Sequence, residues 1–408
     1  MAVWIKEKKY DREIKGILFL ISPFVGFIAS LKDIKTRSSY VIFFLFFVLF
    51  GLSFTVQSGK QGDMTIDAAY YREQFELFQY VSKSEFREGL ITYFTFKTGI
   101  KDYYFNTVAF YISRITSNYH VMFLVFAIVF SYFCLKTFKM FITEDNFDSS
   151  LSCYILTYIF MINQIFNING VRFWTAAWIA VYTVFQIFKN GKRKYFLLVL
   201  LTPFVHVSFW LFVVILFLAT LLIKFHRFQI ILFIISFFLS EISNELIRQQ
   251  IDILPPTLAN LASIYTDPVR IALKSEGGTG FYWITELFNT LERLYINLLV
   301  FLFILDSEDI FRNEKTKLIF PFLLIWMAFC NSTMAIPSLG NRFIQLAYPI
   351  IAYIWLVAFK GKKYQKFLYA APIVFIFSAY TQLNRYTMVL EPYFYISSPI
   401  YLVYRYLI

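Results

Sequence analysis

The chain has 408 residues, of which 59% are hydrophobic and 16% are charged, and its mean hydropathy is +0.60. A soluble protein of this length needs more charge to cover its surface, so the composition excludes an ordinary soluble enzyme and indicates a polytopic membrane protein. The net charge of +12 does not indicate nucleic-acid binding, because Lys and Arg cluster in short loops between apolar runs. Cationic residues in such loops mark the cytoplasmic side of a membrane.

The N-terminal part predicts a hairpin and then one crossing. Residues 6–15 and 32–37 are both basic, and the apolar run between them is short and contains Ser22-Pro23. A re-entrant or surface-lying hairpin fits this run better than a full crossing. Residues 40–55 then cross outward into a long amphipathic segment, 56–118, which we expect on the outer face.

The middle of the chain alternates in direction. Three apolar segments cross in turn: 119–138, 151–167 and 171–188. The next apolar run, 195–223, has basic residues near both ends, so it must turn back within the membrane. As one helix it would extend roughly 43 Å, too long for one crossing and too short for two. Pro203 can break it, which predicts two short helices forming a V with His206 at the outer apex.

The remaining segments keep the same alternation. They are 228–240, a second outer segment at 241–290, 294–305, 318–336, 343–359, 366–382 and a tail at 393–405 that folds back. This alternation places every basic cluster on the inner face. We therefore predict an all-α polytopic membrane protein with roughly ten to twelve membrane segments, some short and re-entrant, forming a single membrane domain over residues 1–408.

Five ionisable residues from separate regions gather at the outer face in this topology. Arg172 and Arg342 each stand at the start of a helix, His206 is at the apex of the V, and Asp63 and Asp67 follow the first outward helix. Ionisable groups near the hydrocarbon are costly and usually face a cavity or a substrate. Two arginines at helix starts, where free N–H groups and the helix dipole add attraction, predict an anion site. The turn before Arg172 carries four amides: Asn163, Gln164, Asn167 and Asn169.

Each of these residues also has a structural interpretation. An arginine within one turn of a helix end can extend to the lipid headgroups. A histidine beside a helix break can satisfy a free backbone carbonyl. Asp63 or Asp67 could be a solvated loop acid. His120 and His226 lie at segment ends and are interpreted as structural, and the three cysteines as small core residues: Cys134, Cys153 and Cys330.

Motifs of soluble enzymes are absent from the sequence. It contains no P-loop, no GxSxG and no HExxH. Asp63 and Asp67 alone provide too few ligands for a metal site. We therefore predict no metal and no cofactor.

Four short motifs resemble one family. They are Asp63 and Asp67 followed by Tyr70 and Tyr71; Asn169-x-x-Arg172-x-x-x-Ala176; PFVHVSF around His206; and GNRF, containing Arg342, followed by Tyr348. In order and spacing they resemble the EpsG family of bacterial exopolysaccharide and capsule proteins, which is related to the Wzy-type O-antigen and capsule polymerases. The segment 241–290 has no clear counterpart in the family pattern.

The resemblance implies a multi-pass protein of the bacterial inner membrane with a fold like that of GT-C glycosyltransferases. It implies a polysaccharide polymerase that joins undecaprenyl-diphosphate-linked oligosaccharide repeat units on the outer face, without a metal. Implied partners are that lipid-linked oligosaccharide, the bilayer, a chain-length regulator and a flippase, and no nucleic acid. A lipid-linked oligosaccharide flippase and a non-catalytic component of the assembly complex stay open as alternatives.

Breaking a sugar–diphosphate bond requires stabilisation of charge that develops on the leaving phosphate. Guanidinium groups match phosphate bidentately, so Arg172 and Arg342 are predicted to bind the diphosphate. His206 would act on the acceptor hydroxyl or bind phosphate, with Asp63 or Asp67 as an alternative base or sugar ligand. Five further residues are predicted to support the sugar: Asn167, Asn169, Asn341, Tyr70 and Tyr71.

Overall fold

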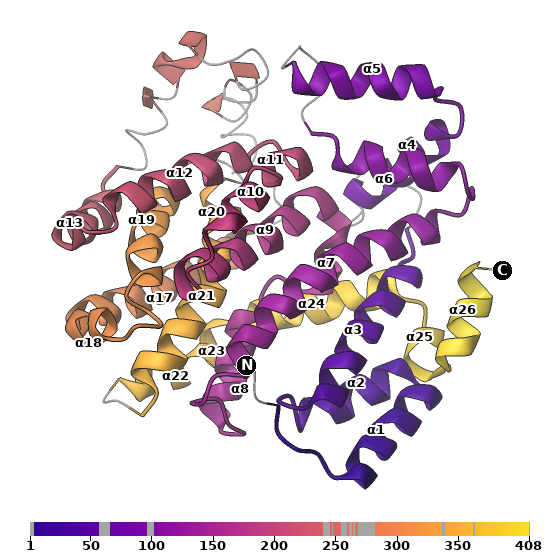
Figure 1. The fold of residues 1–408 in the computed structure, drawn as a ribbon, viewed down its shortest axis with the longest axis horizontal. Coiled ribbons are helices and arrows are strands. Elements are labelled where there is room, and N and C mark those ends of the chain that lie inside the picture. The colour runs from indigo at the N-terminus through magenta and orange to yellow at the C-terminus, as the bar shows by residue number, and fades with distance from the viewer. Residues whose placement is uncertain are drawn as a thin grey trace.

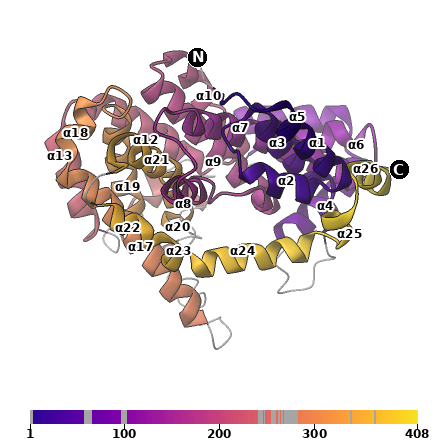
Figure 2. The ribbon, with the colours of Figure 1, turned by 90° about the horizontal axis from the view of Figure 1, so that it is seen from below.

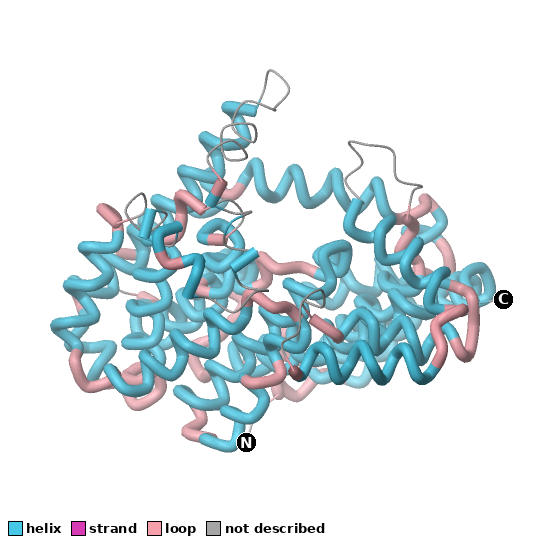
Figure 3. Tube along the Cα trace, turned by 90° about the horizontal axis from the view of Figure 1, so that it is seen from above, coloured by secondary structure: helices cyan, strands magenta, loops and turns pink. Residues whose placement is uncertain are grey.

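The computed structural model of the protein describes residues 4–56, 66–95, 102–239, 245–246, 248–253, 259–260, 263, 266–267, 282–336, 339–361 and 364–407. The described residues are largely helical and include no strand (Figure 3), which confirms the predicted all-α class. Most of the predicted outer segment 241–290 lies outside these residues.

The N-terminal hairpin forms as predicted. Ser22 ends the first helix, and its hydroxyl accepts a hydrogen bond from the Val25 N–H at 3.3 Å, which caps the second helix. Pro23 occupies the first position of that second helix, where its missing N–H costs nothing. The hairpin packs beside the next helix (Figure 1). These three helices are α1 (Lys9–Ile21), α2 (Pro23–Leu31) and α3 (Arg37–Leu52).

The predicted outer segment 56–118 contains three helices grouped at the upper right of Figure 1: α4 (Ile66–Phe78), α5 (Lys83–Phe94) and α6 (Tyr104–Ser113). The long helix α7 (Tyr119–Ile142) follows and packs closely along α3. Gly51 permits this approach, because a Cβ at that position would overlap the side chain of Ala127.

The central part of the chain contains the turn that leads into Arg172. Its elements are α8 (Leu151–Phe160), the 3₁₀ turn η1 (Ile165–Gly170), α9 (Val171–Val184), the π turn η2 (Phe185–Lys189), η3 (Arg193–Tyr195), α10 (Phe196–Val199), α11 (Thr202–Val205), α12 (Phe209–Leu222) and α13 (His226–Ser236). The run 195–223 is interrupted at His206, as predicted. Pro203, however, lies in the first turn of α11 and does not end a helix.

The C-terminal part packs against α8, α9 and α12 and then returns to the N-terminal helices. Its elements are η4 (Ile251–Ile253), α17 (Tyr282–Leu305), α18 (Ser307–Arg312), α19 (Ile319–Ser332), α20 (Gly340–Phe343), η5 (Ile344–Leu346), α21 (Tyr348–Ile354), the π turn η6 (Trp355–Phe359), α22 (Gln365–Tyr369), α23 (Ala371–Val374), α24 (Ile376–Val389), α25 (Tyr393–Ile396) and α26 (Pro399–Leu407). Figure 2 shows α24 running along one face, from α23 to α25.

Four helical stretches among the described residues are long and apolar enough to cross a membrane, or five if one pair bent by 44° counts as a single span. They are Tyr119–Ile142, Leu151–Lys189, Trp283–Leu305, Gly340–Phe359 and the pair Gln365–Val374 with Ile376–Val389. Shorter apolar helices accompany them: α3, α12, α13 and α19. Several of the predicted ten to twelve segments are therefore too short to cross as straight helices.

The stretch Leu151–Lys189 reverses direction although it counts as one apolar span. Lys189, at its end, forms an ion pair with Glu144, which lies shortly before its start. Both ends of the stretch are therefore at the same end of the bundle. The chain runs out along α8 and back along α9, as predicted, and turns at the amide-rich residues 161–170.

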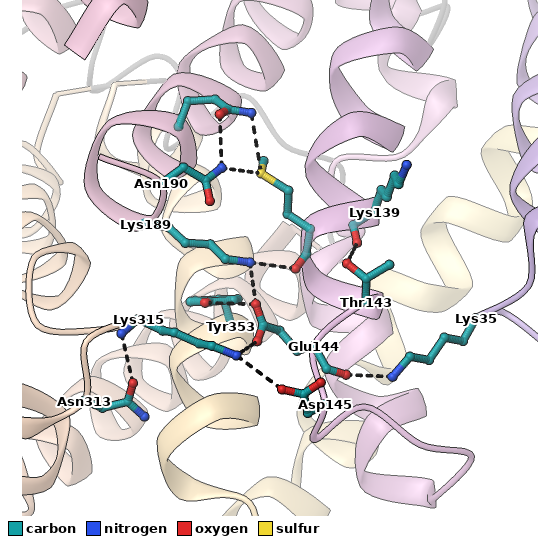
Figure 4. Close-up of polar contacts among 12 residues, drawn as sticks. Lys35, Lys139, Thr143, Glu144, Asp145, Lys189, Asn190, Asn313, Lys315 and Tyr353 are labelled. Carbon is teal, nitrogen blue, oxygen red and sulfur yellow. Dashed lines mark hydrogen bonds and ion pairs between the residues drawn. The ribbon is translucent and has the colours of Figure 1, made fainter. Parts of the chain in front are cut away.

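The basic loops meet around one buried carboxylate, Glu144 (Figure 4). Its oxygens pair with Lys189 Nζ at 2.5 Å and Lys315 Nζ at 2.7 Å, and accept a hydrogen bond from Tyr353 Oη at 3.2 Å. Lys35 Nζ donates to the Glu144 backbone carbonyl at 2.7 Å. We name this the basic end of the bundle. The amide end is the opposite one, where η1 lies near α4, α11 lies near α6 and α20 carries Arg342.

Glu144 is expected to be the main stabilising charge of the basic end. Its side chain and that of Lys189 are 7% and 12% exposed, whereas Lys315 is 47% exposed. Glu144→Gln should therefore cost about 3–5 kcal/mol, because it leaves Lys189 buried without a carboxylate. Lys315→Ala should cost about 1 kcal/mol or less. SDS titration of the purified protein measures both, and equal losses would contradict this assignment.

The same cluster predicts how stability depends on pH. Burial alone would raise the pKa of Glu144, but Lys189 and Lys315 lower it below its usual value. Its contribution is therefore complete above the unfolded-state pKa of about 4.3 and is lost as the pH falls through the lower folded-state value. Glu144→Gln should lack this acid-dependent loss.

Candidate active site

The buried ring of Phe173, in the first turn of α9, is the point where three elements of the amide end converge. Its ring centroid lies 5.2 Å from that of Phe343 in α20, 5.2 Å from Phe209 in α12 and 5.3 Å from His206. The Cζ atom of Arg342 lies 5.7 Å from the same centroid. His206 and Arg342 thus lie against one aromatic side chain, and the charge of Arg172, the residue before Phe173, also acts on His206.

Arg172 is held by two residues of the segment 56–118. Its Nε donates to Tyr71 Oη at 3.1 Å, and its Nη1 donates to Asp102 Oδ1 at 3.1 Å and to Oδ2 at 3.3 Å. The Asp102 side chain is only 3% exposed, whereas that of Arg172 is 32% exposed. Nη2 takes no part in these bonds. The guanidinium is therefore oriented from one side and keeps an accessible edge.

Asp102 was not predicted from the sequence. It lies just before α6, and the backbone N–H of the next residue, Tyr103, donates to the carbonyl of Phe204 in α11 at 3.0 Å. This contact places Asp102 near the start of α9. Tyr71 was predicted as a sugar ligand, but here it supports Arg172. Burial raises the pKa of this tyrosine above its usual value, although Arg172 acts in the opposite direction, so Tyr71 stays protonated.

Arg342 differs from Arg172 because no carboxylate of the described residues pairs with it. Its side chain is exposed, and the cation–π contact with Phe173 is its described interaction. The short helix α20 is fixed beneath it: Trp326 Nε1 donates to the Phe343 carbonyl at 3.1 Å. Gly340 packs so closely on α19 that a Cβ would stand 2.8 Å from the Cys330 carbonyl oxygen. Arg342 is thus an exposed cation on a rigid support.

His206 is half-buried between α11 and α12, outside the helices long enough to cross a membrane. Its Nδ1 accepts a hydrogen bond from the Ser208 backbone N–H at 3.3 Å, and the Ser208 hydroxyl lies 2.8 Å from the same atom. The ring proton therefore resides on Nε2. Burial and the charges of Arg172 and Arg342 lower the pKa of His206 to about 3. A neutral histidine with a protonated Nε2 is a hydrogen-bond donor, which favours phosphate binding over the base role.

The amide-rich turn is braced mainly by its own side chains. Asn167 Nδ2 donates to Asn163 Oδ1 at 2.7 Å, and Asn163 Nδ2 donates to the Trp174 carbonyl at 3.3 Å. Asn169 Oδ1 accepts from the Ala68 N–H at 3.2 Å and so joins the turn to α4. These amides shape the approach to Arg172. Asn341, in contrast, is exposed beside Arg342.

Asp67 and Tyr70 lie at the periphery of the site. Asp67 is exposed, and its Oδ2 would be 3.7 Å from a Cβ placed on Gly170, immediately before α9. Tyr70 is also exposed, and its ring centroid is 6.0 Å from that of Tyr71. Asp63 lies outside the described residues. Within the described part of the chain, no three His, Cys, Asp or Glu side chains group as metal ligands.

The electrostatic environment of His206 can be measured directly. The chain has three histidines, so nitrogen-15 histidine labelling with a His206→Asn variant assigns its signals. We expect its pKa to be about 3. Arg342→Gln should raise it toward the usual value of about 6.5, because removing a nearby positive charge favours the protonated ring. Titration of His206 near pH 6.5 in the unaltered protein would contradict this arrangement.

Comparison with known proteins gives one match. The model of the EpsG family matches residues 44–397, which include α4 and every residue around Phe173. Neither the search of curated proteins nor that of solved structures found a match. The matched region covers most of the chain and confirms the resemblance seen in the four short motifs. The chain is a membrane protein that belongs to the EpsG family.

Proposed function

We propose that the protein is a polysaccharide polymerase of the bacterial inner membrane. It joins undecaprenyl-diphosphate-linked oligosaccharide repeat units on the outer face, by metal-independent glycosyl transfer of the GT-C type. The observation that carries the proposal is the convergence of Arg172, Arg342 and His206 at the amide end. Membership of the EpsG family, a Wzy-type polymerase family, supports it.

In this reaction the acceptor hydroxyl oxygen forms a bond to the anomeric carbon of the donor sugar. The bond from that carbon to the diphosphate oxygen breaks, and its electron pair stays on the leaving oxygen. Negative charge therefore increases on the diphosphate, where fixed cations and N–H donors stabilise the transition state most. Arg172 and Arg342 supply the cations, and the Nε2–H of His206 supplies a neutral donor.

The hydroxyl proton must pass to a base or to solvent. His206 is a poor base in the free protein, since burial and two guanidinium groups oppose its protonation. Asp67, exposed beside Gly170 at the start of α9, is the base that we propose among the described residues, and Asp63 is the alternative. Tyr70 and Asn341 are exposed at the same end and are available to the sugars.

Arg172→Lys and Arg342→Lys should each reduce polymer formation by roughly 100-fold or more, because an ammonium group loses the forked donor geometry. Gel analysis of surface polysaccharide from cells that contain equal amounts of each protein measures the effect. Normal polymer with both variants would refute the proposal. If the protein were a flippase, the same substitutions would instead cause lipid-linked units to accumulate on the inner face.

Asp102→Asn tests the support of Arg172 separately from its charge. The amide keeps the size of the side chain but removes the ion pair, so the guanidinium should lose its fixed orientation. We expect roughly a tenfold loss of polymer formation, less than in Arg172→Lys, with unchanged protein level. Tyr71→Phe removes one neutral hydrogen bond and serves as the milder control. If polymer formation in Asp102→Asn falls only in proportion to the amount of folded protein, Asp102 has a stabilising role only.

A further inference from the structure

The helix α24 also contacts the amide-rich turn. Gln382 Nε2 donates to the Ile162 carbonyl at 3.4 Å, and one turn later Tyr386 Oη donates to Gln164 Oε1 at 2.9 Å. At its start, the Ser378 hydroxyl donates to the buried carboxyl of Glu292 in α17. Two of these contacts join α24 to the turn and the third joins it to α17, and together they fix the rotation of α24, although much of its surface is exposed. Figure 2 shows the course of α24 along one face.

Arg385 lies on α24 between these contacts. Its Cζ atom is 5.7 Å from the ring centroid of Phe166 in η1. Its side chain is exposed, and no carboxylate of the described residues forms an ion pair with it. An exposed guanidinium without a counter-ion among the described residues marks a place where an anion binds favourably. The sequence prediction did not select this residue: Asn384 precedes it, but Arg385 lies within α24 and not at a helix start.

Arg385 repeats the arrangement of Arg342. Each unpaired guanidinium lies 5.7 Å from a phenyl ring, and both rings belong to the stretch 163–178. Phe166 and Phe173 are separated by one 3₁₀ turn and the first turn of α9, which places them no more than roughly 14 Å apart along the backbone. The amide end thus presents two separate cationic positions on one stretch of chain.

We propose that Arg385 is a second diphosphate-binding position, which holds the lipid diphosphate of the acceptor. This inference rests on the proposed polymerase function. Both substrates carry a diphosphate, but only the donor's is released. The position at Phe173 has two arginines and a histidine, as stabilisation of a developing charge requires. The position at Phe166 has one arginine, which is sufficient to hold a diphosphate whose charge does not change.

Binding of farnesyl diphosphate to the full-length protein in detergent tests the proposal. Isothermal titration calorimetry should show two equivalents for the unaltered protein and one for Arg385→Gln. Arg385→Lys keeps the charge but loses the fork, so it should bind the second equivalent roughly tenfold more weakly. Arg405→Gln is the matched control, because this nearby arginine is paired with Glu391 at 3.9 Å; it should retain two equivalents. Thermal unfolding confirms that each variant is folded.

Three outcomes would overturn the proposal. One is a single equivalent in the unaltered protein, and another is two equivalents of equal affinity in Arg385→Gln. The third is displacement of the second equivalent by phosphatidylglycerol in nanodiscs, which would assign Arg385 to a phospholipid headgroup. The proposed function fails separately, if Arg172→Lys and Arg342→Lys still make polymer. Loss of polymer in those variants, with normal polymer and two equivalents in Arg385→Gln, would refute only the second position.

Discussion

The ion pair between Arg172 and Asp102 determines the arrangement of the amide end. A guanidinium at the start of an apolar helix cannot be left without a partner where water is scarce, and Asp102 supplies the opposite charge from a different segment. The bond draws the outer segment onto α9, and the contact of Tyr103 with α11 then positions the break at His206. Removing the carboxylate would therefore loosen two neighbouring parts of the site together.

The two ends of the bundle use charge in different ways. At the basic end, Glu144 is enclosed by two lysines and a tyrosine, so its charge is neutralised and connects the loops. At the amide end, Asp102 pairs with only one edge of the Arg172 guanidinium, and Arg342 and Arg385 each make a cation–π contact with a phenyl ring. A cation on a ring keeps most of its field available to a ligand. The excess of unpaired positive charge at this end suits an anionic substrate.

The sequence predicted the all-α class and the reversal within Leu151–Lys189, because apolar runs and basic loops are strong signals. Several of the predicted segments, however, are too short to cross a membrane as straight helices. The sequence also selected Arg172, Arg342 and His206, since an ionisable residue stands out in an apolar run. Asp102 and Tyr71 were not predicted as partners of Arg172, because acids and tyrosines are common in a polar outer segment and pairing across distant segments leaves no local pattern. Arg385 was missed for a related reason: its significance depends on Phe166, a residue distant in the sequence. The base role of His206 was favoured by the ordinary pKa of histidine, which burial and the two arginines lower only in the folded protein.

The π turns at the ends of α9 and α21 have a consequence for both ends of the bundle. In η2 the Asn190 N–H reaches the Phe185 carbonyl five residues earlier, so this turn holds one residue more than an α-helical turn. One residue corresponds to about 100° of rotation around a helix. Helix α9 must direct Arg172 toward Asp102 at one end and Lys189 toward Glu144 at the other. The wider turn adjusts the second direction independently of the first, so that Lys189 anchors the helix at the basic end without rotating Arg172 out of the site.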